Sequence, residues 1–231
     1  MTKQELRNYI KEEVFPLATH YGFTKWRNGS QGATCLKITE EAQFKFVYGI
    51  FTYNHYKLSS MTAYITFPHL ELIVMPILER SGLYGKGSMQ TYISNRIDYN
   101  TFQNYFEKEM PVSTETDLKP VIEIYKKSIV EDFVPYFDKF SNLNKFYHFI
   151  KDENDPKILQ NWLFSIMHEF SLATIYRLCN DERYESYIND YYNKRKYWYE
   201  KFPDDTDQKR YWKAINELKE VLDRTPPIYN L

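Results

Sequence analysis

The sequence predicts an α+β fold, in which an N-terminal helix and an antiparallel β-meander precede a C-terminal helical bundle or helix-pair region. Three observations predict it: apolar residues follow a helical period up to residue 21, alternate with a period of two between residues 34 and 67, and return to helical spacing after residue 117. We therefore expect residues 1–110 to form an α+β sheet region and residues 117–231 to form a helical region, packed together as one unit.

The first helix has clear start and stop signals. Thr2 and Glu5 have the spacing of a capping box, in which each side chain binds the backbone N–H of the other residue. Gly22 supplies the stop. Pro16 lies inside the apolar stripe, so we expect it to kink the helix or restart it.

Three runs of alternating residues, 34–39, 44–50 and 61–67, predict strands. Asn28-Gly29 before the first run and Glu40–Gln43 between the first two are typical of hairpin connections. Residues 51–60 are expected to form a loop between the second and third strands.

The middle of the chain is predicted with weaker signals. Residues 70–81 return to helical spacing, a strand is expected near 89–97, and Asn100 has the position of a cap for a short helix. The segment "PVSTET", residues 111–116, is the best candidate boundary between the two regions.

The rest of the chain is predicted to be helical. A long stripe over 118–140 is interrupted by Pro135, and shorter helices are expected at 143–150, 158–178, 184–202 and 211–222. The segments from about 156 to 202 form an antiparallel pair joined by "CNDE", which is typical of a helical repeat unit.

The composition is that of a folded globular protein that is rich in aromatic residues. The chain has 231 residues, 43% of them hydrophobic and 26% charged, with 22 Tyr, 16 Phe and 4 Trp. Its formal net charge of −1 lacks the basic excess of a typical nucleic-acid-binding protein. In the segment 184–202 the aromatic residues and most charges fall on different sides of the helix, so we do not expect this segment to bind nucleic acid.

The sequence also predicts a cytoplasmic protein. The first residues contain acids throughout and no apolar run, so they predict neither a signal peptide nor a membrane span. Cys35 and Cys179 lie far apart in apolar segments, which is typical of buried thiols in a reducing compartment.

No metal site, cofactor site or catalytic constellation is expected. The five histidines lie in separate segments, and His168-Glu169 lacks the second histidine that a zinc-protease helix needs, because Leu172 stands in its place. Two acidic clusters, residues 152–155 and 204–207, precede helices, where carboxylates cap free N–H groups.

Two places are candidates for partner binding. The loop 51–60 displays Tyr53, His55 and Tyr56, which either contact a partner or cover the end of the sheet. Arg195 falls near the middle of the aromatic stripe in 184–202: it either stacks on Tyr or Trp rings and pairs with a carboxylate of the same chain, or enters a groove of a partner. Trp198, on the same stripe, is the fifth candidate.

Three segments carry a resemblance to a known family: "HYGFTKW" (20–26), "VPYFDKFSNL" (134–143) and "LATIYRLCNDERY" (172–184). With the order of helix, meander and terminal helix pair, the chain resembles, over roughly residues 5–195, a family of uncharacterised bacterial cytosolic proteins. Some such domains occur beside polymorphic-toxin or contact-dependent systems, where similar α+β proteins are immunity proteins. The resemblance implies no catalytic residues.

The functional expectation is a non-enzymatic cytosolic protein-binding protein of a bacterium, an immunity or accessory factor. A protein partner is expected because Tyr and Trp are favoured at interfaces and no catalytic set is evident. The resemblance implies that this partner is a toxin-like protein or the product of a neighbouring gene. The alternative is an enzyme or nucleic-acid-processing protein whose site assembles from distant residues such as His55 and His168. The sequence predicts neither an oligomeric state nor a substrate.

Overall fold

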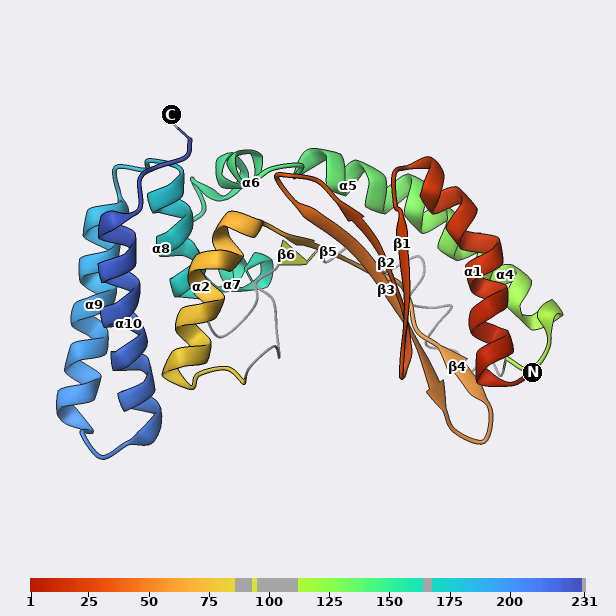
Figure 1. The fold of residues 1–231 in the computed structure, drawn as a ribbon, viewed down its shortest axis with the longest axis horizontal. Helices are drawn as coiled ribbons and strands as arrows, with labels where there is room; N and C mark the ends of the chain where they lie inside the picture. Colours follow the sequence, from red (N-terminus) through yellow and green to blue (C-terminus); the bar gives the residue numbers. More distant parts are fainter. Residues whose placement is uncertain (86–92, 95–111, 164–167, 230–231) are drawn as a thin grey trace. The chain divides into compact units, whose positions relative to one another are not determined.

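The computed structural model describes residues 1–85, 93–94, 112–163 and 168–229 (Figure 1). It has the predicted α+β architecture, with an N-terminal helix, an antiparallel sheet and C-terminal helices. The chain divides into two compact units, and each unit combines two separate stretches of sequence. The first unit contains residues 1–65 and 94–141, and the second contains residues 66–93 and 142–231.

The first helix, α1 (Lys3–His20), has the predicted capping box at Thr2 and Glu5. Its buried stripe faces the core of the first unit and consists of Leu6, Ile10, Val14 and Ala18. Pro16 lies inside the helix without ending it. The chain then turns at Gly22, whose φ of 86° is the left-handed conformation that glycine adopts at little cost.

The sheet contains β1 (Lys25–Gly29), β2 (Gly32–Ile38), β3 (Gln43–Thr52), β4 (Tyr56–Leu58), β5 (Thr62–Thr66) and β6 (Ile93–Ser94). The strand order is β1-β2-β3-β5-β6, and β4 pairs with β3 outside this path. The pairs β1–β2, β2–β3 and β3–β4 are antiparallel, which confirms the predicted meander.

Two predictions about this meander were wrong. Asn28 and Gly29 are not a connection but the last residues of β1, paired with Ala33 and Gly32, so the turn lies at residues 30–31. Strand β1 escaped prediction because four of its five residues are exposed and it has no apolar alternation. Half of the predicted loop 51–60 is strand, since β3 extends to Thr52 and β4 spans Tyr56–Leu58.

One face of β3 forms an aromatic core with the helices that follow the sheet in the first unit. They are α4 (Glu115–Ser128), the π-helical turn η1 (Ile129–Phe133) and α5 (Val134–Lys139). The Phe46 ring centroid lies 5.9 Å from that of Phe133, and the Phe44 centroid lies 5.3 Å from that of Phe137. Such contacts add to the burial energy of the large rings.

The long stripe over 118–140 is interrupted near Pro135, as predicted. A π-helical turn, η1 (Ile129–Phe133), joins α4 to α5, and the Val134 N–H donates to the Ile129 carbonyl. Pro135 has no N–H to continue the α-helical ladder, so the chain accommodates a wider turn before α5 begins.

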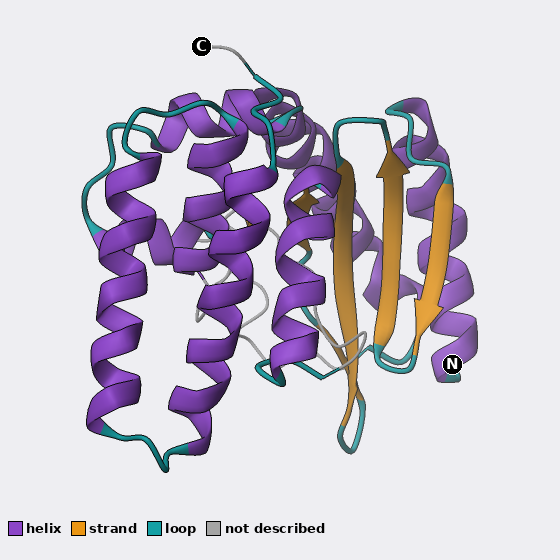
Figure 2. Ribbon diagram, turned by 60° about the vertical axis from the view of Figure 1, so that its left-hand side comes forward, coloured by secondary structure: helices purple, strands orange, loops and turns teal. Residues whose placement is uncertain are grey.

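The second unit is helical and is shown in Figure 2. It contains α2 (Pro68–Ser81), α6 (Leu143–Ile150), α7 (Pro156–Trp162), α8 (His168–Leu178), α9 (Tyr184–Lys201) and α10 (Thr206–Arg224). Helices α9 and α10 form a hairpin, whose connecting loop is its free end (Figure 1). Helix α8 packs against α9, and α2 packs against α10.

The predicted single helix over 158–178 was wrong, because the chain leaves helical geometry at Leu163. That residue has φ −91° and ψ 124°, an extended conformation that ends α7. Helix α8 starts at His168. The predicted helix at Asn100 and most of the predicted strand 89–97 lie outside the described residues.

None of the helices in the described part of the chain combines the length and the apolar character that crossing a membrane requires.

Candidate functional site

The aromatic stripe of α9 changes character along the helix. Its first half is buried against the unit's core through Tyr184, Ile188 and Tyr191. At its C-terminal end, Trp198 and Phe202 are 37% and 45% exposed. The first half of the stripe therefore packs within the chain, and the end of the stripe is exposed.

Arg195 lies where these two halves meet, and its contacts are within the chain. Its guanidinium carbon is 5.1 Å from the Tyr191 ring centroid and 4.0 Å from that of Tyr211. Its Nε donates a hydrogen bond of 3.2 Å to the Tyr191 hydroxyl. With Glu169 nearby, this is the intramolecular arrangement that was one of the two interpretations of this residue.

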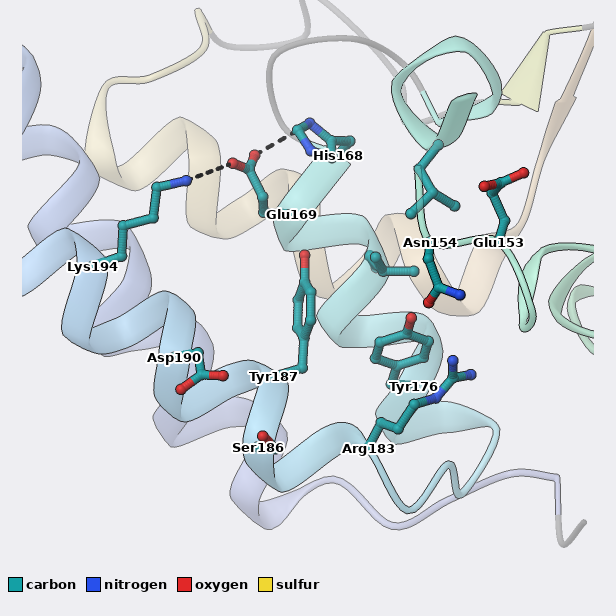
Figure 3. Close-up of a pocket in the computed structure, with 12 residues that line it drawn as sticks. Glu153, Asn154, His168, Glu169, Tyr176, Arg183, Ser186, Tyr187, Asp190 and Lys194 are labelled. Atoms are coloured by element: carbon teal, nitrogen blue, oxygen red, sulfur yellow. Dashed lines mark ion pairs between the residues drawn. The ribbon is translucent and has the colours of Figure 1, made fainter. Parts of the chain in front are cut away.

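The Glu169 carboxylate is the centre of a charged cluster on α8 and α9 (Figure 3). Its oxygens lie 3.3 Å from His168 Nδ1, 3.8 Å from Lys194 Nζ and 3.9 Å from Arg195 Nη2. The Glu169 side chain is only 16% exposed. The Lys194 and Arg195 distances are those of ion pairs, so these two cations balance the charge of the carboxylate. The Glu169 oxygens keep most of their capacity to accept hydrogen bonds among the described residues.

This cluster forms one end of a pocket of about 440 Å³. Its base comes from α8, one wall comes from α9, and the other wall comes from the segment that precedes and includes α7 (Figure 3). The residues that line it are Glu153, Asn154, Leu159, His168, Glu169, Leu172, Tyr176, Arg183, Ser186, Tyr187, Asp190 and Lys194. The sequence did not predict the pocket, because its lining residues come from three segments that only the tertiary fold brings together.

A hydrogen-bonded network fixes the other end of the pocket. Arg183 donates to the buried Asp181 carboxylate through Nη2 at 2.6 Å and stacks on the Tyr176 ring at 4.8 Å. The Tyr147 hydroxyl donates to the same carboxylate at 2.9 Å. Burial raises the pKa of Asp181, but the hydrogen bonds from Arg183 and Tyr147 outweigh it, so the net pKa is lowered.

A second surface lies on the last turns of α9, which we name the aromatic–lysine face. Its members are Lys194, Tyr197, Trp198, Lys201 and Phe202. The Trp198 and Phe202 rings are stacked, with centroids 5.8 Å apart and planes 10° apart. The Lys201 ammonium lies 5.3 to 5.6 Å from the centroids of the three rings around it.

The remaining candidates lie in the first unit. Tyr53 is 67% exposed in the turn between β3 and β4. His55 and Tyr56 are half-buried, and the Tyr56 backbone bridges to Val112 as well as pairing with Thr52. The structure therefore groups Tyr53, His55 and Tyr56 at one hairpin end, and it places Arg195 and Trp198 on one helix of the other unit.

Tyr197 and Phe202 were not named as candidates, although a signal for them existed. Lys194, Trp198, Lys201 and Phe202 follow the spacing i, i+4, i+7, i+8, which places them on one side of a helix. The spacing alone does not show that this side of the helix is exposed at its C-terminal end.

The acidic clusters act as helix caps, as predicted. Asp155 accepts a hydrogen bond from the Lys157 N–H, and Asp205 accepts from the N–H groups of Asp207 and Gln208. Within the described residues, no group of three or more His, Cys, Asp or Glu side chains could hold a metal ion.

Comparison of the chain with family models, with curated proteins and with solved structures finds no match.

Proposed function

We propose that the chain is a non-enzymatic protein-binding protein and that the aromatic–lysine face contacts its partner. The observation that carries this proposal is the exposure of three neighbouring aromatic side chains at the end of one helix. Tyr197 is 55% exposed, and Trp198 and Phe202 are 37% and 45% exposed. Trp and Tyr are over-represented among the residues that dominate binding energy at protein interfaces.

The face is organised before any partner arrives, which lowers the cost of binding. Trp198 and Phe202 hold each other by stacking, and Lys201 donates a hydrogen bond of 3.2 Å to the Tyr197 hydroxyl. Side chains that are already ordered lose less conformational entropy on association. The stem of Lys201 also lies among the rings, so the cluster behaves as one surface rather than as separate side chains.

The charge of the face favours a partner that offers carboxylates beside apolar side chains. Over residues 194–202 there are four basic residues and one acid, Glu200. Glu200 pairs with Lys196 at 3.9 Å. Lys194 and Arg195 pair with Glu169. Lys201 is therefore the charge presented beside the rings, and complementary carboxylates on the partner would speed association and fix its register.

A single-stranded nucleic acid fits this face less well than a protein. The Trp198 and Phe202 rings are stacked on each other, so they do not form the separate platforms on which successive bases stack. Asp204, Asp205 and Asp207 follow directly in the sequence, where they would oppose a phosphate backbone.

The resemblance to bacterial proteins found beside toxin systems supports a finer proposal. In it, the protein acts in the cytoplasm as an immunity or accessory factor, and its partner is a toxin-like product of a neighbouring gene. The two buried cysteines are compatible with a reducing compartment.

The test is calorimetric titration of the purified chain with the product of the neighbouring gene. We expect binding by the wild type and a loss of affinity of about 100-fold or more for the double variant Trp198→Ala/Phe202→Ala. The variant should keep its melting temperature within a few degrees, because both side chains are partly exposed. The matched control is Leu72→Ala, which removes a side chain that is 74% exposed elsewhere in the same unit.

The triple variant Tyr53→Ala/His55→Ala/Tyr56→Ala separates the two candidate surfaces. Full binding by the triple variant together with loss in the double variant supports the aromatic–lysine face. The reverse result would move the partner site to the β3–β4 turn and reject our assignment. Absence of binding by the wild type would reject the immunity or accessory role.

A further inference from the structure

The pocket in the second unit gathers polar groups that can still form hydrogen bonds. The hydroxyls of Tyr176 and Tyr187 and the side-chain oxygen of Asn154 have no hydrogen-bond partner among the described residues, and the Glu169 carboxylate is held by charge contacts of 3.3 to 3.9 Å. In Figure 3 the Tyr187 hydroxyl points toward His168 and Glu169, and the Tyr176 hydroxyl points toward Asn154. Such groups are ready to bind a ligand with several polar atoms.

The phenol hydroxyls remain donors under ordinary conditions. Burial raises the pKa of Tyr187 above its usual value, and the nearby Glu169 charge raises it further. Burial likewise raises the pKa of Tyr176. Each hydroxyl can therefore both donate and accept a hydrogen bond, while the Glu169 carboxylate and the Asn154 side-chain oxygen only accept.

The pocket also offers apolar contact. Leu159 and Leu172 line it between the polar groups, and the Tyr176 and Tyr187 rings meet edge to face with centroids 5.3 Å apart. A ligand with polar edges and apolar C–H faces would match both kinds of surface, because apolar groups pack on aromatic rings while the edges form hydrogen bonds.

The charges of the lining argue against a charged ligand. A cation approaching Glu169 would meet Lys194 and Arg195, which already neutralise that carboxylate. An anion would meet Glu153, Glu169 and Asp190. Arg183 is engaged by Asp181 at 2.6 Å, so it is not available to offset them. A neutral ligand avoids both conflicts.

We infer that this pocket binds a neutral polyhydroxylated molecule, a small saccharide. Its hydroxyls would donate to Glu169 and Asn154 and exchange hydrogen bonds with the Tyr176 and Tyr187 hydroxyls, while its C–H groups pack on Leu172 and the Tyr187 ring. The site is separate in residues from the aromatic–lysine face except for Lys194, so this inference does not depend on the protein-binding proposal.

The experiment is calorimetric titration of the full chain, at millimolar ligand, with glucose, galactose, N-acetylglucosamine and maltose. Glucose 6-phosphate and putrescine serve as the anionic and cationic comparators. We expect at least one neutral saccharide to bind. Both charged comparators should bind about tenfold more weakly or not at all, because each places its charge near groups of the same charge in the site.

Two variants place the binding in the pocket. Tyr187→Phe removes one hydroxyl and should weaken saccharide binding about 3- to 10-fold, the value of one hydrogen bond. Glu169→Gln keeps the shape but removes the charge, and should weaken it by about tenfold or more. The matched controls are Tyr184→Phe, whose hydroxyl bonds Asp223 instead, and Glu185→Gln on the exposed side of α9. Both controls should bind like the wild type.

Three outcomes would overturn the inference: no binding of any neutral saccharide in the panel, tighter binding of glucose 6-phosphate or putrescine, or equal affinity in wild type and Tyr187→Phe. Should Glu169→Gln fail to fold, the Tyr187→Phe result alone decides, because that variant removes a single atom that has no partner within the described residues.

Discussion

Arg195 Nη2 lies 3.9 Å from Glu169 Oε1, and the two side chains are only 14% and 16% exposed. Their separation is too long for a hydrogen bond, so the close contacts of this arginine are with two tyrosines. Its Nε donates to the Tyr191 hydroxyl at 3.2 Å, and the Tyr211 ring centroid lies 4.0 Å from its guanidinium carbon. A desolvated cation–π contact of this kind contributes about 2 kcal/mol. Arg195 therefore stabilises the second unit mainly by stacking, with Glu169 as its counter-charge.

Replacing Arg195 should destabilise the chain. We expect Arg195→Ala to lower the free energy of unfolding by about 2–4 kcal/mol, because it removes the stacked group and leaves Glu169 without one of its partners. Urea unfolding followed by circular dichroism measures the change. Lys196→Ala, which breaks an exposed ion pair of 3.9 Å with Glu200, is the control and should stay within about 0.5 kcal/mol. Equal stability of the two variants would contradict the stacking role.

The Asp181 network should make stability depend on acid pH. Because the folded-state pKa of Asp181 is lowered below its ordinary value, the group stabilises the fold fully above the unfolded pKa of about 4 and loses that contribution as pH falls through the folded pKa. Asp181→Asn should cost about 2–4 kcal/mol at neutral pH. The difference between wild type and variant should shrink as pH falls below about 4.

The control for this pH effect is Asp204→Asn, an exposed residue that makes no hydrogen bond or ion pair in the described part of the chain. Its stability should follow the wild type at every pH. A wild-type to Asp181→Asn difference that is constant across the acid range would show that the carboxylate does not have a lowered pKa.

Gly32 should tolerate no side chain. A Cβ at this position would lie 1.8 Å from the Tyr48 carbonyl oxygen, which is a backbone atom of the neighbouring strand. We expect Gly32→Ala to cost more than about 2 kcal/mol, because the strands must separate to relieve the overlap. At Gly29, on the same hairpin, the nearest atom would be 3.9 Å away, so Gly29→Ala is the control. Comparable melting temperatures for both variants would contradict the close approach of β2 and β3.

The two cysteines should be unreactive in the folded protein. Burial raises the pKa of Cys35 and of Cys179 to about 12, and the thiolate is the reactive form. We expect Ellman's reagent at pH 8 to label neither thiol in native buffer and both in urea. Rapid labelling of one thiol in the native protein would show that its segment opens readily.

Elements with local signals were predictable, whereas elements set by tertiary contacts were not. The capping box at Thr2 and Glu5 depends on only four consecutive residues, so the start of α1 could be predicted. Strand β1 has only one half-buried residue, Trp26, and forms because β2 offers it hydrogen-bonding partners. The end of α7 at Leu163 falls inside an apolar stripe of helical period, so no periodicity argument could locate it.

The candidate sites also differ in whether a local sequence signal or a tertiary contact determines them. The sequence identified Arg195 because a charge within an aromatic stripe is visible on a helical wheel, and its partners Tyr191 and Glu169 lie on the same helix and on the preceding one. The pocket needed the segment around Asn154 to approach α8 and α9, and nothing in the spacing of those residues encodes that approach.

The division into two units has a consequence for synthesis on the ribosome. The chain passes between the units three times, at residues 65–66, 93–94 and 141–142. Neither unit is a continuous stretch of sequence. The first unit therefore cannot finish folding until Ser141 has emerged from the exit tunnel, and the second unit cannot finish folding until the last helix has emerged. No single truncation yields one unit without a segment of the other. We expect the N-terminal or the C-terminal half of the chain, expressed alone, to yield insoluble material.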